Sequence, residues 1–131
     1  SKDKFEKAAR SRPLRKHFYI RMGQSGFDEA DIAKAIDDIR DTVERMERAL
    51  ADRGPWIMGA QYTLADICVA PLIDRMEDLG FEQIWEANKP EVTSWFGRMK
   101  ERSAYRIAYY EGARFSEIYP ELELGRSTPM R

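Results

Sequence analysis

The chain has 131 residues, of which 43% are hydrophobic and 34% charged, and its formal net charge is −1. This size fits a single domain that buries about two-thirds of its unfolded surface, and the balanced charge argues against nucleic acid or a membrane as a partner. The one cysteine, Cys68, excludes an internal disulfide. An apolar run of about 18 residues and a leader are both missing from the sequence, which predicts a cytoplasmic protein.

Residues 1–24 are predicted to hold a partial first helix and a linker, divided by Pro13. Leu14, Phe18 and Met22 recur every four residues, the spacing of one helical stripe. The same segment carries a basic cluster, which is either an exposed helix face or an anion-binding surface. The second alternative arises because arginine binds carboxylates and phosphates with bidentate hydrogen bonds. The cluster consists of Arg10, Arg12, Arg15, Lys16, His17 and Arg21.

A long amphipathic helix is predicted over 28–53. Gly23 and Gly26 should end the preceding helix, and Asp28 can cap this one. Its apolar residues step by four and three: they are Ile32, Ile36, Ile39, Val43, Met46 and Leu50. The stripe could form a coiled coil, but it spans fewer than three heptads and stops at Gly54-Pro55, which favours a bundle helix.

The stretch from Tyr62 to Ile67 has the pattern of a helix start. Thr63 can act as the N-cap, and Asp66, three residues on, can reach back to the Thr63 N–H and close a capping box. Tyr62 and Ile67 flank this box at the positions of a hydrophobic staple, in which their side chains meet across the first turn.

The helix that follows is apolar on more than one face and is predicted to lie in the core. Its apolar residues are Leu64, Ile67, Val69, Leu72, Ile73 and Met76. Cys68 belongs to this stretch and is expected to be a small core residue rather than a nucleophile.

Three further signals divide the rest of the chain. Gly80 is a natural residue to follow a helix end, and Pro90 suits the first turn of the next helix. Val92, Trp95, Phe96 and Met99 then share one helical face. Ser103 can cap a last short helix, and the tail from Gly125 is expected to be disordered.

These elements predict an all-α fold, a bundle of about five helices. Residues 1–24 form the partial first helix and linker, 25–112 the helical core domain, and 113–131 a partly disordered C-terminal extension. No strand-like alternation and no internal repeat is found in the sequence.

The sequence offers no catalytic group of its own. His17 is the only histidine, so neither a metal site rich in histidine and cysteine nor a serine triad can be built. Glycine-rich phosphate loops and calcium-binding loops are missing as well. We therefore expect neither a catalytic residue nor a metal site in this chain.

The order of these motifs resembles the C-terminal helical domain of the glutathione transferase superfamily. The resemblance covers roughly residues 28–112: a long helix, Trp56 and Gly59, the run Tyr-Thr-Leu-Ala-Asp-Ile, a buried helix with Pro71 and Arg75, then Pro90 and Trp95, and then Arg98 to Arg102. Members of this family have an N-terminal thioredoxin-like domain that binds glutathione. Nothing in residues 1–131 resembles that domain.

The resemblance implies roles for several residues. Thr63 and Asp66 would be structural. The helical domain of the family lines the site of the electrophilic substrate, and by position six residues here are candidates for it: Arg15, Tyr19, Tyr105, Tyr109, Tyr110 and Phe115.

The leading hypothesis is the electrophile-site domain of a glutathione transferase. The whole enzyme would use glutathione as co-substrate, transfer it to a small electrophile and form a homodimer, while this fragment alone would be inactive. The alternative is a transferase-like helical module that assembles proteins without catalysis. An unrelated helical regulator is a third and weaker reading.

Overall fold

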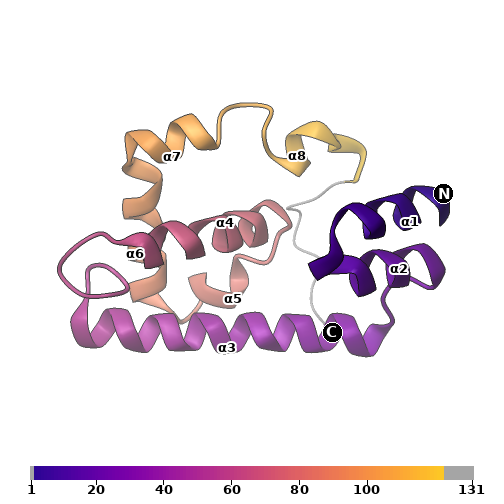
Figure 1. Ribbon diagram of the computed structural model, residues 1–131. Helices are drawn as coiled ribbons and strands as arrows, with labels where there is room; N and C mark the ends of the chain where they lie inside the picture. The colour runs from indigo at the N-terminus through magenta and orange to yellow at the C-terminus, as the bar shows by residue number, and fades with distance from the viewer. Residues whose placement is uncertain (1, 123–131) are drawn as a thin grey trace. The chain divides into compact units, whose positions relative to one another are not determined.

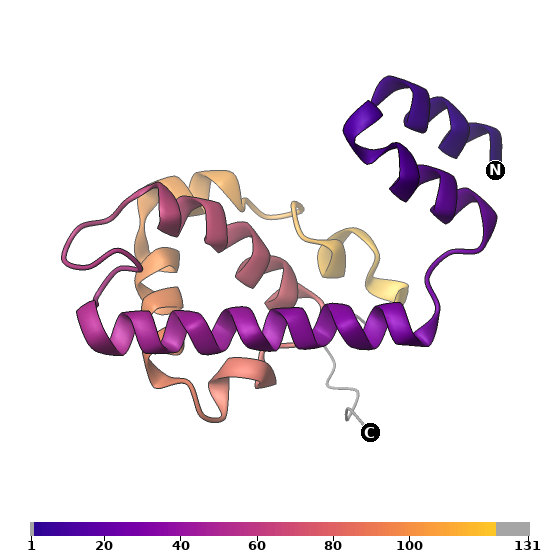
Figure 2. The same ribbon diagram turned by 60° about the horizontal axis from the view of Figure 1, so that its bottom comes forward.

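The computed structural model describes residues 2–122, and this part of the chain contains eight α-helices and two short 3₁₀ helices (Figures 1 and 2). Within the same range there is no strand, only an isolated bridge between Trp56 and Gly59. The predicted all-α class is therefore confirmed. The chain divides into two units, one ending at Ile39 and one beginning at Arg40. The predicted domain bounds at residues 24 and 112 stay a prediction.

The first unit begins with two helices joined by a tight turn. α1 (Lys2–Ser11) and α2 (Lys16–Gln24) run antiparallel and side by side (Figure 1), and the 3₁₀ helix Pro13–Arg15 connects them. α2 continues one residue past Gly23, which was predicted to help end this helix. A Cβ atom at Gly23 would lie only 2.9 Å from Cβ of Phe5, so glycine permits the close approach of the two helices.

α3 (Glu29–Arg53) begins at its predicted cap, because Asp28 Oδ1 accepts a hydrogen bond from Asp31 N at 2.9 Å. It ends before Gly54-Pro55, as predicted. Three residues of the predicted stripe are buried, and all belong to the second unit: Val43, Met46 and Leu50.

α4 (Leu64–Asp78), α5 (Gln83–Glu86) and α6 (Pro90–Glu101) complete the core of the second unit. α6 starts with proline in its first turn, as predicted, and buries all four of its predicted core residues: Val92, Trp95, Phe96 and Met99. The Trp85 ring of α5 lies edge-on to Phe96, with 6.2 Å between the ring centroids.

The N-terminus of α6 is capped by a side chain from α3. Glu47 Oε2 accepts from Val92 N at 2.9 Å, and Glu47 Oε1 accepts from Glu91 N at 3.3 Å. Lys89, which precedes α6, forms an ion pair with Glu44 of α3. A carboxylate at a helix N-terminus also complements the helix dipole, so these contacts fix α6 against α3.

The end of α4 has the geometry that its glycine predicts. Gly80 adopts φ +84°, its N–H donates to Glu77 O at 3.0 Å, and Phe81 N donates to Met76 O at 2.9 Å. This pair of bonds is a Schellman motif, which satisfies the last carbonyls of a helix.

We expect opposite effects from adding a methyl group at two glycines. Gly80→Ala should lower the free energy of unfolding by about 1 kcal/mol, because alanine disfavours a positive φ. Gly97→Ala should raise it by about 0.5 to 1 kcal/mol, since Gly97 lies inside α6 with open space around the position of a Cβ atom. Urea unfolding of both variants checks this pair. Equal effects would contradict the assigned conformations.

α4 is less buried than its apolar composition predicts. Leu64 is 75% exposed and Ile67 46%, while three aspartates of the same helix are buried: Asp66, Asp74 and Asp78. Cys68 is exposed too, so its predicted place in the core is wrong. The apolar residues of α4 cover several faces, and some of these faces remain exposed in this unit.

The chain continues after α6 with α7 (Ser103–Ala108), α8 (Phe115–Ile118) and the 3₁₀ helix Pro120–Leu122. The cap of α7 is Arg102, one residue before the predicted Ser103, and it uses no side-chain hydrogen bond. These elements contain no fully buried residue. The tail predicted to be disordered, from Gly125, lies outside the described residues.

Candidate functional site

Asp66 is fully buried, and both of its carboxylate oxygens accept hydrogen bonds. Oδ2 accepts from Thr63 N at 2.9 Å and from Thr63 Oγ1 at 3.2 Å, and Oδ1 accepts from Ile57 N at 3.0 Å and Trp95 Nε1 at 2.9 Å. Thr63 Oγ1 accepts from Ala65 N at 3.3 Å, and a capping box is present at the start of α4. One carboxylate thus joins the loop, α4 and α6.

The charge of Asp66 is stabilised by these donors. Burial raises the pKa of the carboxyl group, but the hydrogen bonds from Ile57, Thr63 and Trp95 outweigh burial and hold the pKa below its ordinary value. The carboxylate therefore stays ionised at neutral pH. Because all four donors are fixed parts of the fold, its role is to position the loop rather than to transfer a proton.

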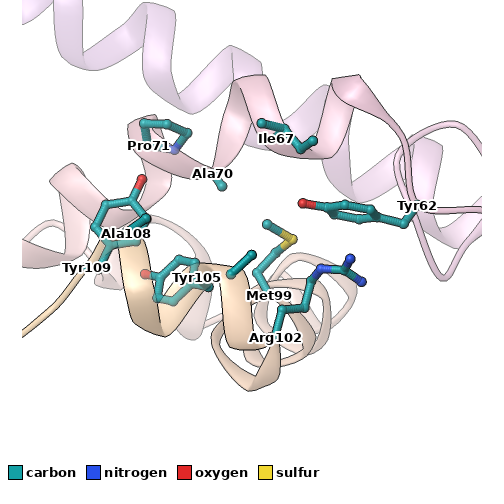
Figure 3. A pocket seen from close by; sticks show the side chains of 10 residues that line it. Tyr62, Ile67, Ala70, Pro71, Met99, Arg102, Tyr105, Ala108 and Tyr109 are labelled. Atoms are coloured by element: carbon teal, nitrogen blue, oxygen red, sulfur yellow. The ribbon is translucent and has the colours of Figure 1, made fainter.

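The loop places Tyr62 between two other side chains. The Tyr62 ring lies edge-on to Trp56, with 5.1 Å between centroids, and the Arg102 guanidinium carbon lies 3.5 Å from the Tyr62 ring centroid. Ile67 lines the same pocket as Tyr62 (Figure 3). The packing of Tyr62 is thus shared with partners far along the chain, and its stapling to Ile67 stays a prediction.

A largely apolar pocket of about 320 Å³ lies between α4, the end of α6 and α7 (Figure 3). Its size falls at the lower end of the range for small-molecule sites. Tyrosines, small side chains and one cation line it: Tyr62, Ile67, Ala70, Pro71, Met99, Arg102, Ala104, Tyr105, Ala108 and Tyr109. We call this the tyrosine pocket.

Two candidate substrate residues meet in the tyrosine pocket. The centroids of the Tyr105 and Tyr109 rings are 4.4 Å apart, and the Tyr105 hydroxyl donates a hydrogen bond to Asp74 Oδ1. Burial and the Asp74 carboxylate raise the pKa of both phenols above the ordinary value. Both hydroxyls therefore stay protonated, so these residues serve as neutral walls of the pocket rather than as bases.

The C-terminal segment is held by an acid cluster on α4, formed by Asp74, Glu77 and Asp78. Arg114 Nη2 donates to Asp74 Oδ1 at 2.7 Å and to Glu77 Oε2 at 2.6 Å. Lys100 also pairs with Glu77. Burial raises the pKa of Glu77, but Arg114 and Lys100 outweigh it, and the pKa lies below its ordinary value.

Asp78 anchors the start of α8. Its oxygens accept from Phe115 N at 2.8 Å, Ser116 N at 3.1 Å, Ser116 Oγ at 2.6 Å and Arg75 Nη1 at 2.7 Å. Burial raises the pKa of Asp78, and these donors lower it to below its usual range. The segment is therefore attached to α4 through ionised groups.

The other candidate substrate residues lie elsewhere. Tyr110 is 64% exposed and is not part of the pocket wall. Phe115 stacks under the Arg75 guanidinium, 4.0 Å from carbon to ring centroid. Arg15 is exposed and Tyr19 packs against Phe18, and both belong to the first unit.

Arg102 and Met99 are pocket residues that the sequence did not predict. Met99 has the signature of a core residue. Arg102 belongs to a helix end rich in basic residues, and nothing in its local pattern distinguishes it from Arg98 or Arg106. Its guanidinium group lies over the ring of Tyr62, which is 40 residues away along the chain.

Residues 2–122 contain neither a candidate membrane-spanning helix nor a cluster of metal ligands. No helix there combines the length and apolar character needed to cross a membrane. The same residues contain no group of three or more histidine, cysteine, aspartate or glutamate side chains placed to hold a metal ion.

Comparison with known proteins adds relatives. The chain is 29% identical over 89 residues to a tetrachloro-p-hydroquinone reductive dehalogenase of Sphingobium chlorophenolicum, covering 68% of this chain and 35% of that protein. It is 32% identical over 84 residues to a 2,5-dichlorohydroquinone reductive dechlorinase of Sphingobium indicum, covering 62% and 24%. The chain thus spans about a third or less of the length of these relatives.

A human relative is not named as a dehalogenase. Ganglioside-induced differentiation-associated protein 1-like 1 is 30% identical over 82 residues, covering 58% of this chain and 22% of that protein. No solved structure matches the chain significantly. The family model described as the C-terminal domain of glutathione S-transferase matches residues 8–98, well over half of the chain. The chain therefore belongs to the glutathione S-transferase family and carries its C-terminal domain.

Proposed function

We propose that this chain is the substrate-side helical domain of a glutathione-dependent enzyme that acts on a small aromatic electrophile. The tyrosine pocket is the observation that carries the proposal. It is the size of one or two aromatic rings, and its tyrosines, methionine and small side chains favour a flat apolar molecule. Two relatives are named for reactions on chlorinated hydroquinones, which are molecules of this type.

The chemistry would be divided between two domains. We assign no thiol-activating group to residues 2–122: Cys68 is exposed on α4 and is not part of the pocket wall, and the Tyr105 hydroxyl is engaged with Asp74. A thioredoxin-like domain of the whole protein would supply glutathione and its thiolate. The helical domain would contribute positioning, which lowers the barrier by holding the electrophile near sulfur. The whole enzyme is expected to be a homodimer and cytoplasmic.

Ligand binding by the chain itself tests the proposal. We expect the purified chain to bind 2-naphthamide, a neutral bicyclic aromatic probe, with a one-to-one stoichiometry in calorimetry and saturation-transfer NMR. Ala108→Trp fills the pocket and should weaken binding at least about tenfold. Ala51→Trp on the exposed face of α3 is the matched control and should leave binding unchanged. No binding, or equal effects of both variants, would refute the use of the pocket.

Activity measurements separate the enzyme from a protein-assembly module. The isolated chain should consume no glutathione in the presence of an aromatic chloride, because the proposal assigns activation of the thiol to the thioredoxin-like domain. Turnover by the chain alone would contradict the division of labour. A folded chain that ignores aromatic ligands and instead associates with other proteins would favour the assembly module.

A further inference from the structure

Arg102 is the one cation in the wall of the tyrosine pocket, and its charge has no anionic partner among the described residues. Its Nε atom is buried without a hydrogen-bond partner. Among the described residues, none that lines the pocket is acidic. An unpaired buried donor costs free energy, and a guanidinium group is suited to pair with a planar anion.

The geometry leaves the donors of Arg102 available. Its guanidinium carbon lies 3.5 Å from the Tyr62 ring centroid, so the group stacks on the ring face. The N–H bonds of a guanidinium lie in its own plane and point sideways in such a stack, not into the ring. Stacking therefore fixes the orientation of Arg102 while its hydrogen-bonding capacity remains unused.

The neighbouring charges do not compete for Arg102. Arg98 is used differently, because its Nη2 donates to Pro55 O at 2.7 Å and so holds the loop. The Asp66 carboxylate already accepts four hydrogen bonds from the loop and from Trp95. The C-terminal end of α6, where Arg102 lies, also favours a positive charge.

We infer that the tyrosine pocket takes an aromatic anion, a molecule of one or two rings bearing a carboxylate or phenolate oxygen, and that Arg102 binds this oxygen. The ring lies against the Tyr105, Tyr109 and Met99 side chains, and the anionic oxygen faces the edge of the guanidinium. This inference rests on the proposed function and adds the charge of the ligand. Arg102 is then a specificity-determining residue, with Tyr62 as its positioning residue.

Two probes with the same ring system test the charge. The chain should bind 2-naphthoate about tenfold or more tightly than 2-naphthamide at neutral pH, because a charge-assisted pair replaces a neutral contact. Both affinities are measured by calorimetry on the purified chain at low salt. Equal affinities would overturn the inference while leaving the pocket as a neutral aromatic site. If neither probe binds, the proposed function fails as well.

Substitutions locate the interaction. Arg102→Gln should weaken 2-naphthoate about tenfold and leave 2-naphthamide within about twofold, the latter also showing that the pocket is intact. Arg102→Lys keeps the charge and should retain the preference for the anion. Arg106→Gln is the matched control: it removes the same charge one turn away, outside this pocket. An equal loss in Arg102→Gln and Arg106→Gln would show a general charge effect and refute the role of Arg102.

Discussion

Asp66→Asn should lower the free energy of unfolding by about 3 to 5 kcal/mol, the largest effect expected from a single polar substitution in this chain. An amide keeps the shape of the carboxylate but replaces one acceptor oxygen with a donor. Donors from Ile57, Thr63 and Trp95 converge on the group, and the Trp95 indole cannot reach water instead because it is fully buried. Guanidinium unfolding followed by tryptophan fluorescence measures the loss.

Two control variants separate the cap from the wider network. Thr63→Ala removes only the side-chain part of the box and should cost about 1 kcal/mol. Asp52→Asn changes an exposed carboxylate and should cost less than about 0.5 kcal/mol. A loss in Asp66→Asn no greater than in Thr63→Ala would show that the bonds to Ile57 and Trp95 contribute little.

The stability of the chain at acidic pH should also depend on the Asp66 carboxylate. The folded pKa of Asp66 lies below the unfolded value of about 3.9, so its contribution to stability is present above about pH 4 and is lost as pH falls through the folded pKa. The wild-type chain should therefore lose stability below about pH 4 more steeply than Asp66→Asn. Parallel curves would contradict the direction of the shift.

Asp78→Ala is expected to release the start of α8 rather than to unfold the core. Its partners Phe115 and Ser116 lie in a segment without buried residues, so their amides can turn to water once the carboxylate is gone. Hydrogen exchange of these two amides should accelerate by about 30-fold or more, while the global free energy of unfolding falls by only about 1 kcal/mol.

A graded series checks this local opening. Ser116→Ala removes the hydroxyl bond to Asp78 and leaves both amide bonds, so exchange should rise only several-fold. Arg114→Gln removes the contacts to Asp74 and Glu77 and should give an intermediate acceleration. If exchange at Trp95 accelerates as much as at Phe115, the segment and the core open together and the local interpretation is wrong.

The parts of the fold that could be predicted depend on short-range chemistry. The box of Thr63 and Asp66 joins residues three positions apart, and the helix end at Gly80 depends on the conformation of one glycine. The core face of α6 follows from spacing alone, because an apolar stripe with tryptophan and phenylalanine has no other place in a helical fold. In each of these cases, the residues that determine the structure lie within one or two helical turns of one another.

The parts that could not be predicted depend on partners far along the chain. Asp78 is buried, and its hydrogen-bond partners Phe115 and Ser116 lie 37 and 38 residues later in the chain. Arg102, in the pocket wall, contacts the ring of Tyr62, which lies 40 residues earlier in the chain. Conversely, Ile67 and Cys68 were expected inside, since composition shows that a helix is apolar on several faces but not which faces are covered.

The polar attachment of α8 to α4 would allow the sequence of this region to vary among related proteins. In the described residues 109–122, the contacts with α4 are ion pairs, hydrogen bonds and the Phe115 ring against Arg75, and no side chain of this stretch is fully buried. Insertions or exchanges there would alter the rim near Tyr109 while the central helices keep their register. Related proteins could thus differ in ligand selectivity through substitutions near their C-termini, without a change in the packing of the central helices.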